Sequence, residues 1–97
     1  MAKPPHHRVW LHALEDDKTV PDFALQAARV YADFAASATD RGVHVSFRML
    51  LRCTHQWRNR AGWSVGWLRE HGWLELAEGG NGKRSFYRLT IPATEPV

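Results

Sequence analysis

The sequence predicts an α+β domain in which helices come first and a β-hairpin closes the chain. Up to Gly72, apolar residues recur every three or four positions, which is the spacing of amphipathic helices. Beyond Gly72, two short segments alternate apolar and polar residues on either side of "GGNGKR". That pattern predicts two strands joined by a turn.

Length and composition indicate one compact domain. Ninety-seven residues, 44% of them hydrophobic and 11% aromatic, suffice for a single core. We expect one domain over 1–97 with its core at about 8–91. The ends, 1–7 and 92–97, contain repeated prolines, and we expect them to be loosely held.

Residue types that would indicate a metal site, a disulfide or a membrane span are scarce. Cys53 is the single cysteine, so no internal disulfide can form, and the six histidines have no partners at metal-ligand spacing. The chain contains no secretion signal and no apolar run of about eighteen residues. "GGNGKR" does not open a helix, as a phosphate-binding P-loop would. We therefore expect a cytoplasmic protein without metal or cofactor that is not an enzyme.

Two helices are predicted in the N-terminal part. Trp10, Leu11 and Leu14 indicate a short first helix that ends at the acidic "EDDK". The second helix begins near Pro21 and Asp22, which both suit a first helical turn, and continues through "VYADFAASA". Its apolar positions are Phe23, Ala27, Val30 and Phe34.

A short strand and a third helix follow Gly42, which can turn the chain. "VHV", residues 43–45, predicts the strand, and the hydroxyl of Ser46 can cap a helix over 47–53. The side chains of this helix that we expect to face inward are those of Phe47, Leu50 and Leu51.

A fourth helix is predicted from about 59 to 71, after the connector "THQWRN", and Gly72 ends it. At about 100° per residue, one stripe of this segment collects the residues that we expect to face the core. The stripe comprises Trp57, Ala61, Ser64, Val65 and Leu68, and the opposite side comprises Asn59, Trp63 and Gly66. Gly62 and Gly66 each cost a helix about 0.8–1 kcal/mol relative to alanine. We expect close packing of another backbone, or a partner surface, to compensate.

The C-terminal hairpin carries two cations. Strands are predicted at 73–78 and 85–91, with the turn at 79–84. Lys83 and Arg84 are therefore expected at the tip of the hairpin.

Positive charge is concentrated in the C-terminal half. Residues 1–42 carry five Lys/Arg and six Asp/Glu. Residues 43–91 carry eight Lys/Arg and three Asp/Glu, and the C-terminal tail adds only Glu95. The three parts therefore contribute net charges of −1, +5 and −1. This asymmetry is typical of a surface that binds a polyanion, although a solvated positive face without a partner would give the same count.

The order of these elements resembles the winged helix-turn-helix family of DNA-binding domains over residues 21–91. The residues that match the family's spacing are Leu50, Leu51, Ala61, Val65, Leu68 and Gly72, and the hairpin follows them. One departure lies in the turn, where the family usually has a small residue or glycine followed by an aliphatic residue. Here the turn is "THQW", residues 54–57, so the angle between the two helices of the motif is left open.

The resemblance implies binding to duplex DNA. The helix at 59–71 would then enter the major groove, and its N-terminal side chains would contact bases. The residues implied as base contacts are Arg58, Asn59, Arg60 and Trp63. The residues implied as phosphate contacts are Arg48 and Arg52 on the preceding helix and Lys83 and Arg84 on the basic wing, 79–84. A transcriptional regulator or a replication or recombination accessory factor would fit, and contacts of Arg58–Arg60 with phosphate or water alone remain open.

An interaction module of another class is the alternative. Trp63 and Trp67 could form a docking surface of a winged-helix adaptor, because exposed aromatic residues often mark protein interfaces. Trp67 itself is expected either under the wing or against the first helices. We also expect a homodimer, since 1–38 have apolar surface to spare and related proteins often bind two half-sites.

Overall fold

The structure is a computed structural model that describes residues 6–35, 42–80 and 83–92, with Lys83 and Arg84 described by their backbone alone. Within these residues the chain forms four helices followed by two antiparallel strands, which confirms the α+β class. The elements are α1 (His6–Asp16), α2 (Asp22–Ala35), α3 (Phe47–Thr54), α4 (Arg58–Glu70), β1 (Leu74–Gly80) and β2 (Lys83–Leu89).

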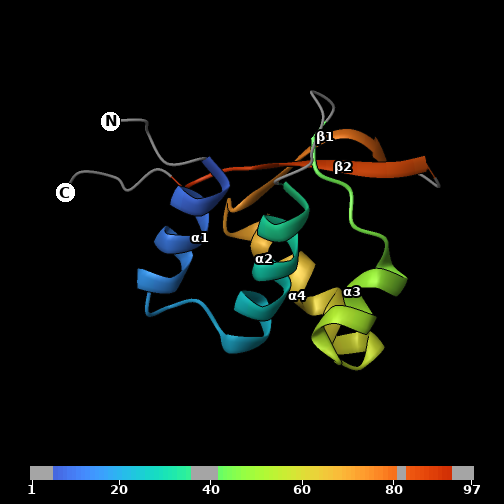
Figure 1. Ribbon diagram of the computed structural model, residues 1–97, viewed down its shortest axis with the longest axis horizontal. Helices are drawn as coiled ribbons and strands as arrows, with labels where there is room; N and C mark the ends of the chain where they lie inside the picture. Colours follow the sequence, from blue (N-terminus) through green and yellow to red (C-terminus); the bar gives the residue numbers. More distant parts are fainter. Residues whose placement is uncertain (1–5, 36–41, 81–82, 93–97) are drawn as a thin grey trace.

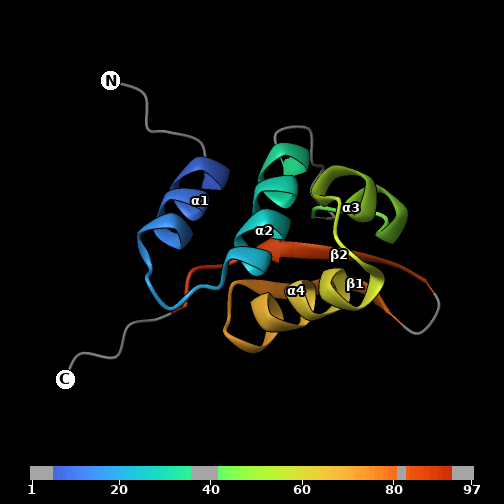
Figure 2. The same ribbon diagram turned by 90° about the horizontal axis from the view of Figure 1, so that it is seen from below.

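The helix α2 is central, because α1, α3 and α4 all pack against it. Figure 1 shows α1 and α2 running side by side in opposite directions, with the hairpin lying along one side of the helical part. The base of the hairpin lies beside α1, and the two strands extend away from α1 in both views (Figures 1 and 2). None of the described helices is long and apolar enough to cross a membrane.

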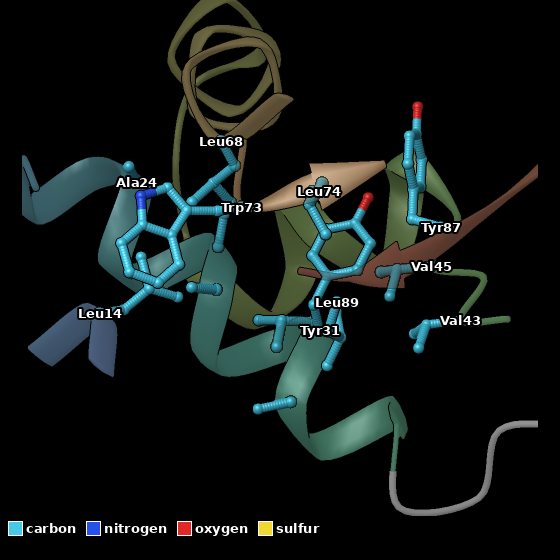
Figure 3. Close-up of a cluster of buried hydrophobic side chains, with 14 of the residues drawn as sticks. Leu14, Ala24, Tyr31, Val43, Val45, Leu68, Trp73, Leu74, Tyr87 and Leu89 are labelled. Atoms are coloured by element: carbon cyan, nitrogen blue, oxygen red, sulfur yellow. The ribbon is translucent and has the colours of Figure 1, made fainter. Parts of the chain in front are cut away.

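The core is formed by residues of all four helices, of the segment 43–45 and of the inner face of the hairpin (Figure 3). Its largest completely buried apolar side chains are Trp10, Leu14, Leu50 and Leu68. The rings of Tyr31 and Tyr87 meet edge to face with their centroids 6.0 Å apart, which joins α2 to β2. Ala27 and Val30 are buried as predicted, so the apolar period located the inner face of α2 correctly.

One tryptophan connects α1 to both ends of the hairpin. Trp10 is fully buried, and its indole N–H lies 2.9 Å from the carbonyl oxygens of both Trp73 and Thr90, to which it donates. Trp73 immediately precedes β1 and Thr90 immediately follows β2, so one donor holds the two strands together at their base. Nε2 of His6 lies 2.7 Å from the carbonyl oxygen of Leu89 and adds a second link.

The structure differs from the sequence predictions at two places in the N-terminal half. The helix α1 begins at His6, inside the segment 1–7 whose looseness stays a prediction, and His6 contacts Leu89 of the hairpin. The predicted strand at 43–45 is a single bridge in which Val43 and Tyr87 exchange two backbone hydrogen bonds of 2.8 Å. Only three residues separate the turn at Gly42 from the cap of α3, which is too short for a ladder. The 36–38 end of the predicted second helix lies outside the described residues.

Two aromatic side chains expected in the core are exposed. Phe47 is 44% exposed, because the first residue of α3 lies at the edge of the domain while Leu50, one turn later, faces the core. Trp57 is 86% exposed. It is the extended N-cap of α4, with φ −67° and ψ 154°, so the helical phase that placed it in the core stripe does not apply to it.

The hairpin turn is shorter than predicted. Gly80 pairs with Lys83, so the strands extend into the expected 79–84 turn, and the connecting residues 81–82 lie outside the described part. The alternating pattern places Leu74 opposite Leu89 and Leu76 opposite Tyr87. The ladder is irregular on either side of Glu78.

Replacing Trp10 with phenylalanine tests the link between α1 and the hairpin. Trp10→Phe removes the shared donor and part of a buried ring, so we expect the free energy of unfolding to fall by about 2–4 kcal/mol. Urea denaturation followed by circular dichroism measures it. Val9→Ala on the same helix is the control, because Val9 is 41% exposed and should change stability by less than about 0.5 kcal/mol. Equal stability of the two variants would contradict the role of the indole N–H.

Candidate functional site

The candidate site begins with α3, whose two ends are defined by local hydrogen bonds. The backbone N–H of Met49 donates to the hydroxyl of Ser46 over 3.1 Å, which confirms the predicted cap. At the other end, His55 takes a left-handed conformation with φ 56°, and its N–H donates to the carbonyl oxygen of Leu51 over 2.9 Å. The chain therefore turns sharply after α3 and enters α4 within three residues.

A polar cluster attaches this turn and α4 to the start of α2. The hydroxyl oxygen of Ser64, which is fully buried, lies 2.7 Å from the carbonyl oxygen of Arg60 and 2.9 Å from that of Phe23. The side-chain amide of Gln56 donates to the same Phe23 carbonyl over 3.1 Å and to the side-chain oxygen of Gln26 over 2.9 Å. The polar "THQW" turn is thus hydrogen-bonded to α2. These bonds connect the turn, whose geometry the sequence left open, to α2.

Arginines follow this helix pair on its outer surface. Arg48 and Arg52 are exposed and lie one turn apart on α3, and Arg58 and Arg60 are exposed in the first turn of α4. Between residues 42 and 69 the sequence has five arginines and no aspartate or glutamate. None of these arginines pairs with a carboxylate of the described residues, whereas Arg29 lies 3.6 Å from Glu15 on the opposite part of the molecule. The surface of α3 and of the first turn of α4 is therefore positively charged, and its arginines have no ion-pair partner in the described part.

The N-terminus of α4 adds partial positive charge. Trp57 makes no side-chain cap bond, and no acidic residue occupies the first turn. The first backbone N–H groups of a helix then have no intrahelical acceptor, and together with the helix dipole they favour an anion. Arg58 and Asn59 stand at this same end.

The side chains predicted as base contacts diverge around α4. Asn59 is exposed, and Trp63 is 66% exposed on the same outward side. The guanidinium carbon of Arg60 lies 5.8 Å from the centre of the Phe23 ring, so Arg60 stands on the flank next to α2. Trp57, which sequence analysis assigned to the core, is the most exposed large aromatic residue in the described part. Its position before the first helical residue was the signal that could have identified it.

Trp67 borders a groove on the α2 side of α4. Phe23 and Trp63 line the same groove, so Trp67 lies against the first helices, one of the two expected positions. The Trp67 ring stacks on that of His71, with centroids 4.0 Å apart, and Nδ1 of His71 lies 2.9 Å from the Trp67 carbonyl oxygen. No group of metal-binding side chains occurs among the described residues.

The two glycines of α4 border open space. No atom outside the helix would lie within 4 Å of a methyl group built on Gly62 or Gly66. Close packing against another backbone of this chain, one of the two expected compensations, is therefore excluded for the described structure. Both glycines line a pocket of about 440 Å³ between α3, α4 and β2.

The cations predicted on the hairpin lie in β2. Lys83 is the first residue of that strand, at the end of the hairpin farthest from α1 (Figure 1). The side chains of Lys83 and Arg84 lie outside the described part, so their contact with phosphate stays a prediction.

No protein family, no curated protein and no solved structure matches this chain. 

The open space at Gly62 and Gly66 leads to a stability prediction. Gly62→Ala and Gly66→Ala should each raise the free energy of unfolding by about 1 kcal/mol, because alanine favours the helix and its methyl group meets nothing. Thermal or urea denaturation measures the change.

Gly42→Ala is the matched control. Gly42 has a φ of +116°, and a methyl group there would lie 2.9 Å from the Tyr87 carbonyl oxygen, so this variant should lose stability. Destabilisation by alanine at either Gly62 or Gly66 would contradict the open space along α4.

Proposed function

We propose that this chain is a winged helix-turn-helix domain that binds duplex DNA. Support comes from the positive surface, because four exposed arginines lie on α3 and at the start of α4. The first turn of α4 contains no acidic residue of its own, and Asp22 of α2 is the acidic residue that lines a pocket with Trp57 and Arg60 there. Phosphate groups are the anions that such a surface attracts along a duplex. Binding, and not catalysis, is the proposed activity, in a transcriptional regulator or a replication or recombination accessory factor.

The arrangement of elements is compatible with this family. The bridge at Val43 joins the segment before α3 to the hairpin, and α3, the turn, α4 and the two strands follow in the family's order. In the proposed complex α4 enters the major groove, α3 lies against the backbone and the hairpin acts as the wing. Arg58, Asn59 and Trp63 then contact base edges, while Arg60 beside Phe23 is also placed to reach a phosphate.

A protein-binding adaptor is the second candidate. The observation that favours it is the exposure of aromatic rings, 66% for Trp63 and 86% for Trp57, with Trp67 in the groove beside them. Exposed tryptophans are frequent anchors of protein interfaces. In this case the arginines would contact an acidic partner. Homodimerisation through 1–38 also stays a proposal, and sedimentation at micromolar concentration would test it by showing a species larger than 11.1 kDa.

Salt dependence tests the phosphate contacts. Arg48→Ala and Lys83→Ala should each weaken binding to every duplex to a similar extent. Each should also reduce the slope of log K against log salt concentration by about one, because one fewer counterion is released. Fluorescence anisotropy with labelled duplexes between about 50 and 200 mM salt measures both quantities. Arg29→Ala is the control, since Arg29 lies on α2 beside Glu15, away from the proposed interface. Unchanged slopes for both variants would contradict the phosphate assignment.

Truncation of the α4 N-terminus tests base contacts. The triple variant Arg58→Ala, Asn59→Ala, Arg60→Ala should cost about 1–3 kcal/mol for each true base contact on the preferred site and much less on random DNA. Folding should be retained, since all three side chains are exposed. Binding selection on random duplexes identifies the preferred site, and fluorescence anisotropy then measures the ratio of the affinities for that site and for random DNA.

Trp63→Ala separates the two candidates. Under the DNA proposal it lowers duplex affinity, whereas under the adaptor proposal duplex affinity is unchanged and a protein partner is lost from pull-downs. If wild type binds no duplex at about 50 mM salt, where phosphate contacts are strongest, the adaptor replaces the DNA proposal.

A further inference from the structure

The pocket between α3, α4 and β2 has the size and lining of a small-molecule site. Its volume of about 440 Å³ lies within the range of about 300–1,000 Å³ that is usual for such sites. Val45, Leu50 and Val65 supply its apolar wall. Phe47, the exposed ring at the start of α3, stands at the same pocket.

The side chain of a largely buried tyrosine lines this pocket. Tyr31 is 2% exposed, and no hydrogen bond of its hydroxyl is described. Every completely buried side-chain oxygen or nitrogen of the described part has a hydrogen-bond partner. A Tyr31 oxygen without such a partner therefore retains access to solvent, which the pocket provides. Figure 3 shows the hydroxyl groups of Tyr31 and Tyr87 pointing toward the same side. A hydroxyl group that lines a pocket without a protein partner can bond a ligand there.

The charge of the pocket favours an anion. The guanidinium carbon of Arg69 lies 5.7 Å from the centre of the Tyr87 ring, at the same pocket, and no Asp or Glu is among the described residues that line it. Burial raises the pKa of Tyr31, with a further increase from Tyr87 and an opposing effect of Arg69. The Tyr31 hydroxyl therefore stays protonated at neutral pH and can donate. Arg69 and Tyr31 both line the pocket and both adjoin the Tyr87 ring. A guanidinium and a hydroxyl that face one pocket can donate to the two oxygens of a carboxylate.

The glycines of α4 provide the space for a ligand. Gly62 and Gly66 form part of the pocket wall, and a methyl group at either position would occupy space that is open here. Alanine at these positions would stabilise the helix, so the glycines lower stability without a contact inside the protein that requires them. A ligand that approaches the α4 backbone would require them.

We propose that this pocket binds a small planar organic carboxylate, with its anionic group between Arg69 and the hydroxyl of Tyr31 and its ring against the apolar wall. A free small molecule fits better than a DNA phosphate. The phosphates of a duplex lie on the surface of a wide double helix and cannot enter a narrow pocket, whereas Tyr31 lies below the protein surface. The site does not require the proposed DNA binding. It is tested in the absence of any duplex.

Benzoate is the probe, with benzamide as its uncharged match of the same shape. Titration of the ¹⁵N-labelled full chain with each compound is followed by two-dimensional NMR. Benzoate should shift the backbone signals of Gly62, Gly66 and Arg69 in a saturable way with a Kd on the order of 1 mM, as expected for a ligand of this size. Benzamide should bind at least about tenfold more weakly, because it lacks the charge that Arg69 attracts. Equal binding of the two compounds, no saturable shift, or shifts distributed over all surface arginines would overturn the proposal.

Three variants test where the carboxylate of benzoate binds and whether the ligand lies against the glycines of α4. Tyr31→Phe removes only the hydroxyl and Arg69→Gln only the charge, and each should weaken benzoate binding about tenfold. Gly66→Ala places a methyl group in the open space of the pocket and should weaken binding while raising the melting temperature, so that weaker binding cannot come from loss of folding. Arg88→Gln is the control, because Arg88 is exposed on β2 and does not line the pocket, and it should leave Kd unchanged. Wild-type affinity in Tyr31→Phe or Arg69→Gln would refute the assigned position.

Discussion

A carbonyl oxygen at the start of α2, that of Phe23, connects the helix pair α3–α4 to the rest of the helical part. Ser64 is the single polar residue in the buried set of the described part, and its hydroxyl has an acceptor within α4, the carbonyl oxygen of Arg60 at 2.7 Å. The same hydroxyl also lies 2.9 Å from the carbonyl oxygen of Phe23. Gln56 donates to the same carbonyl, so the turn before α4 is held at the same point. The two helices that carry the exposed arginines are thus hydrogen-bonded to α2.

The hairpin needs a comparable attachment, because two strands alone are only marginally stable in water. Trp10 supplies it by donating to the carbonyls that flank both strands at their base. The bridge between Val43 and Tyr87 and the edge-to-face contact of Tyr31 with Tyr87 hold the hairpin farther along. The wall of the pocket that β2 contributes is therefore positioned by α1 and α2, two helices that contribute little to the candidate interface itself.

The helix α4 combines a well-packed inner face with an outer face that is poor for stability. Ala61 and Leu68 are fully buried, whereas Gly62 and Gly66 weaken the helix and border open space. Trp63 exposes an apolar ring to water on the same outer side. Features that lower stability without an internal contact are expected where a surface serves binding. The exposed tryptophan and the two glycines therefore make this outer side of α4 the starting point of the proposed binding functions.

The sequence by itself determined where most helices and strands lie, because caps, periodicity and turn residues act over a few positions. Ser46 as the cap of α3, and Ala61 and Leu68 in the core stripe, follow from such local signals. Only the tertiary structure decided the exposure of Trp57, which depends on the bend that precedes α4, and the partners of Trp10, which lie 63 and 80 residues away along the chain. The pocket beside Tyr31 was likewise decided only by the tertiary structure. Its walls come from elements that are distant in sequence, and no local pattern specifies which of them meet, because their packing depends on burying all apolar faces at once.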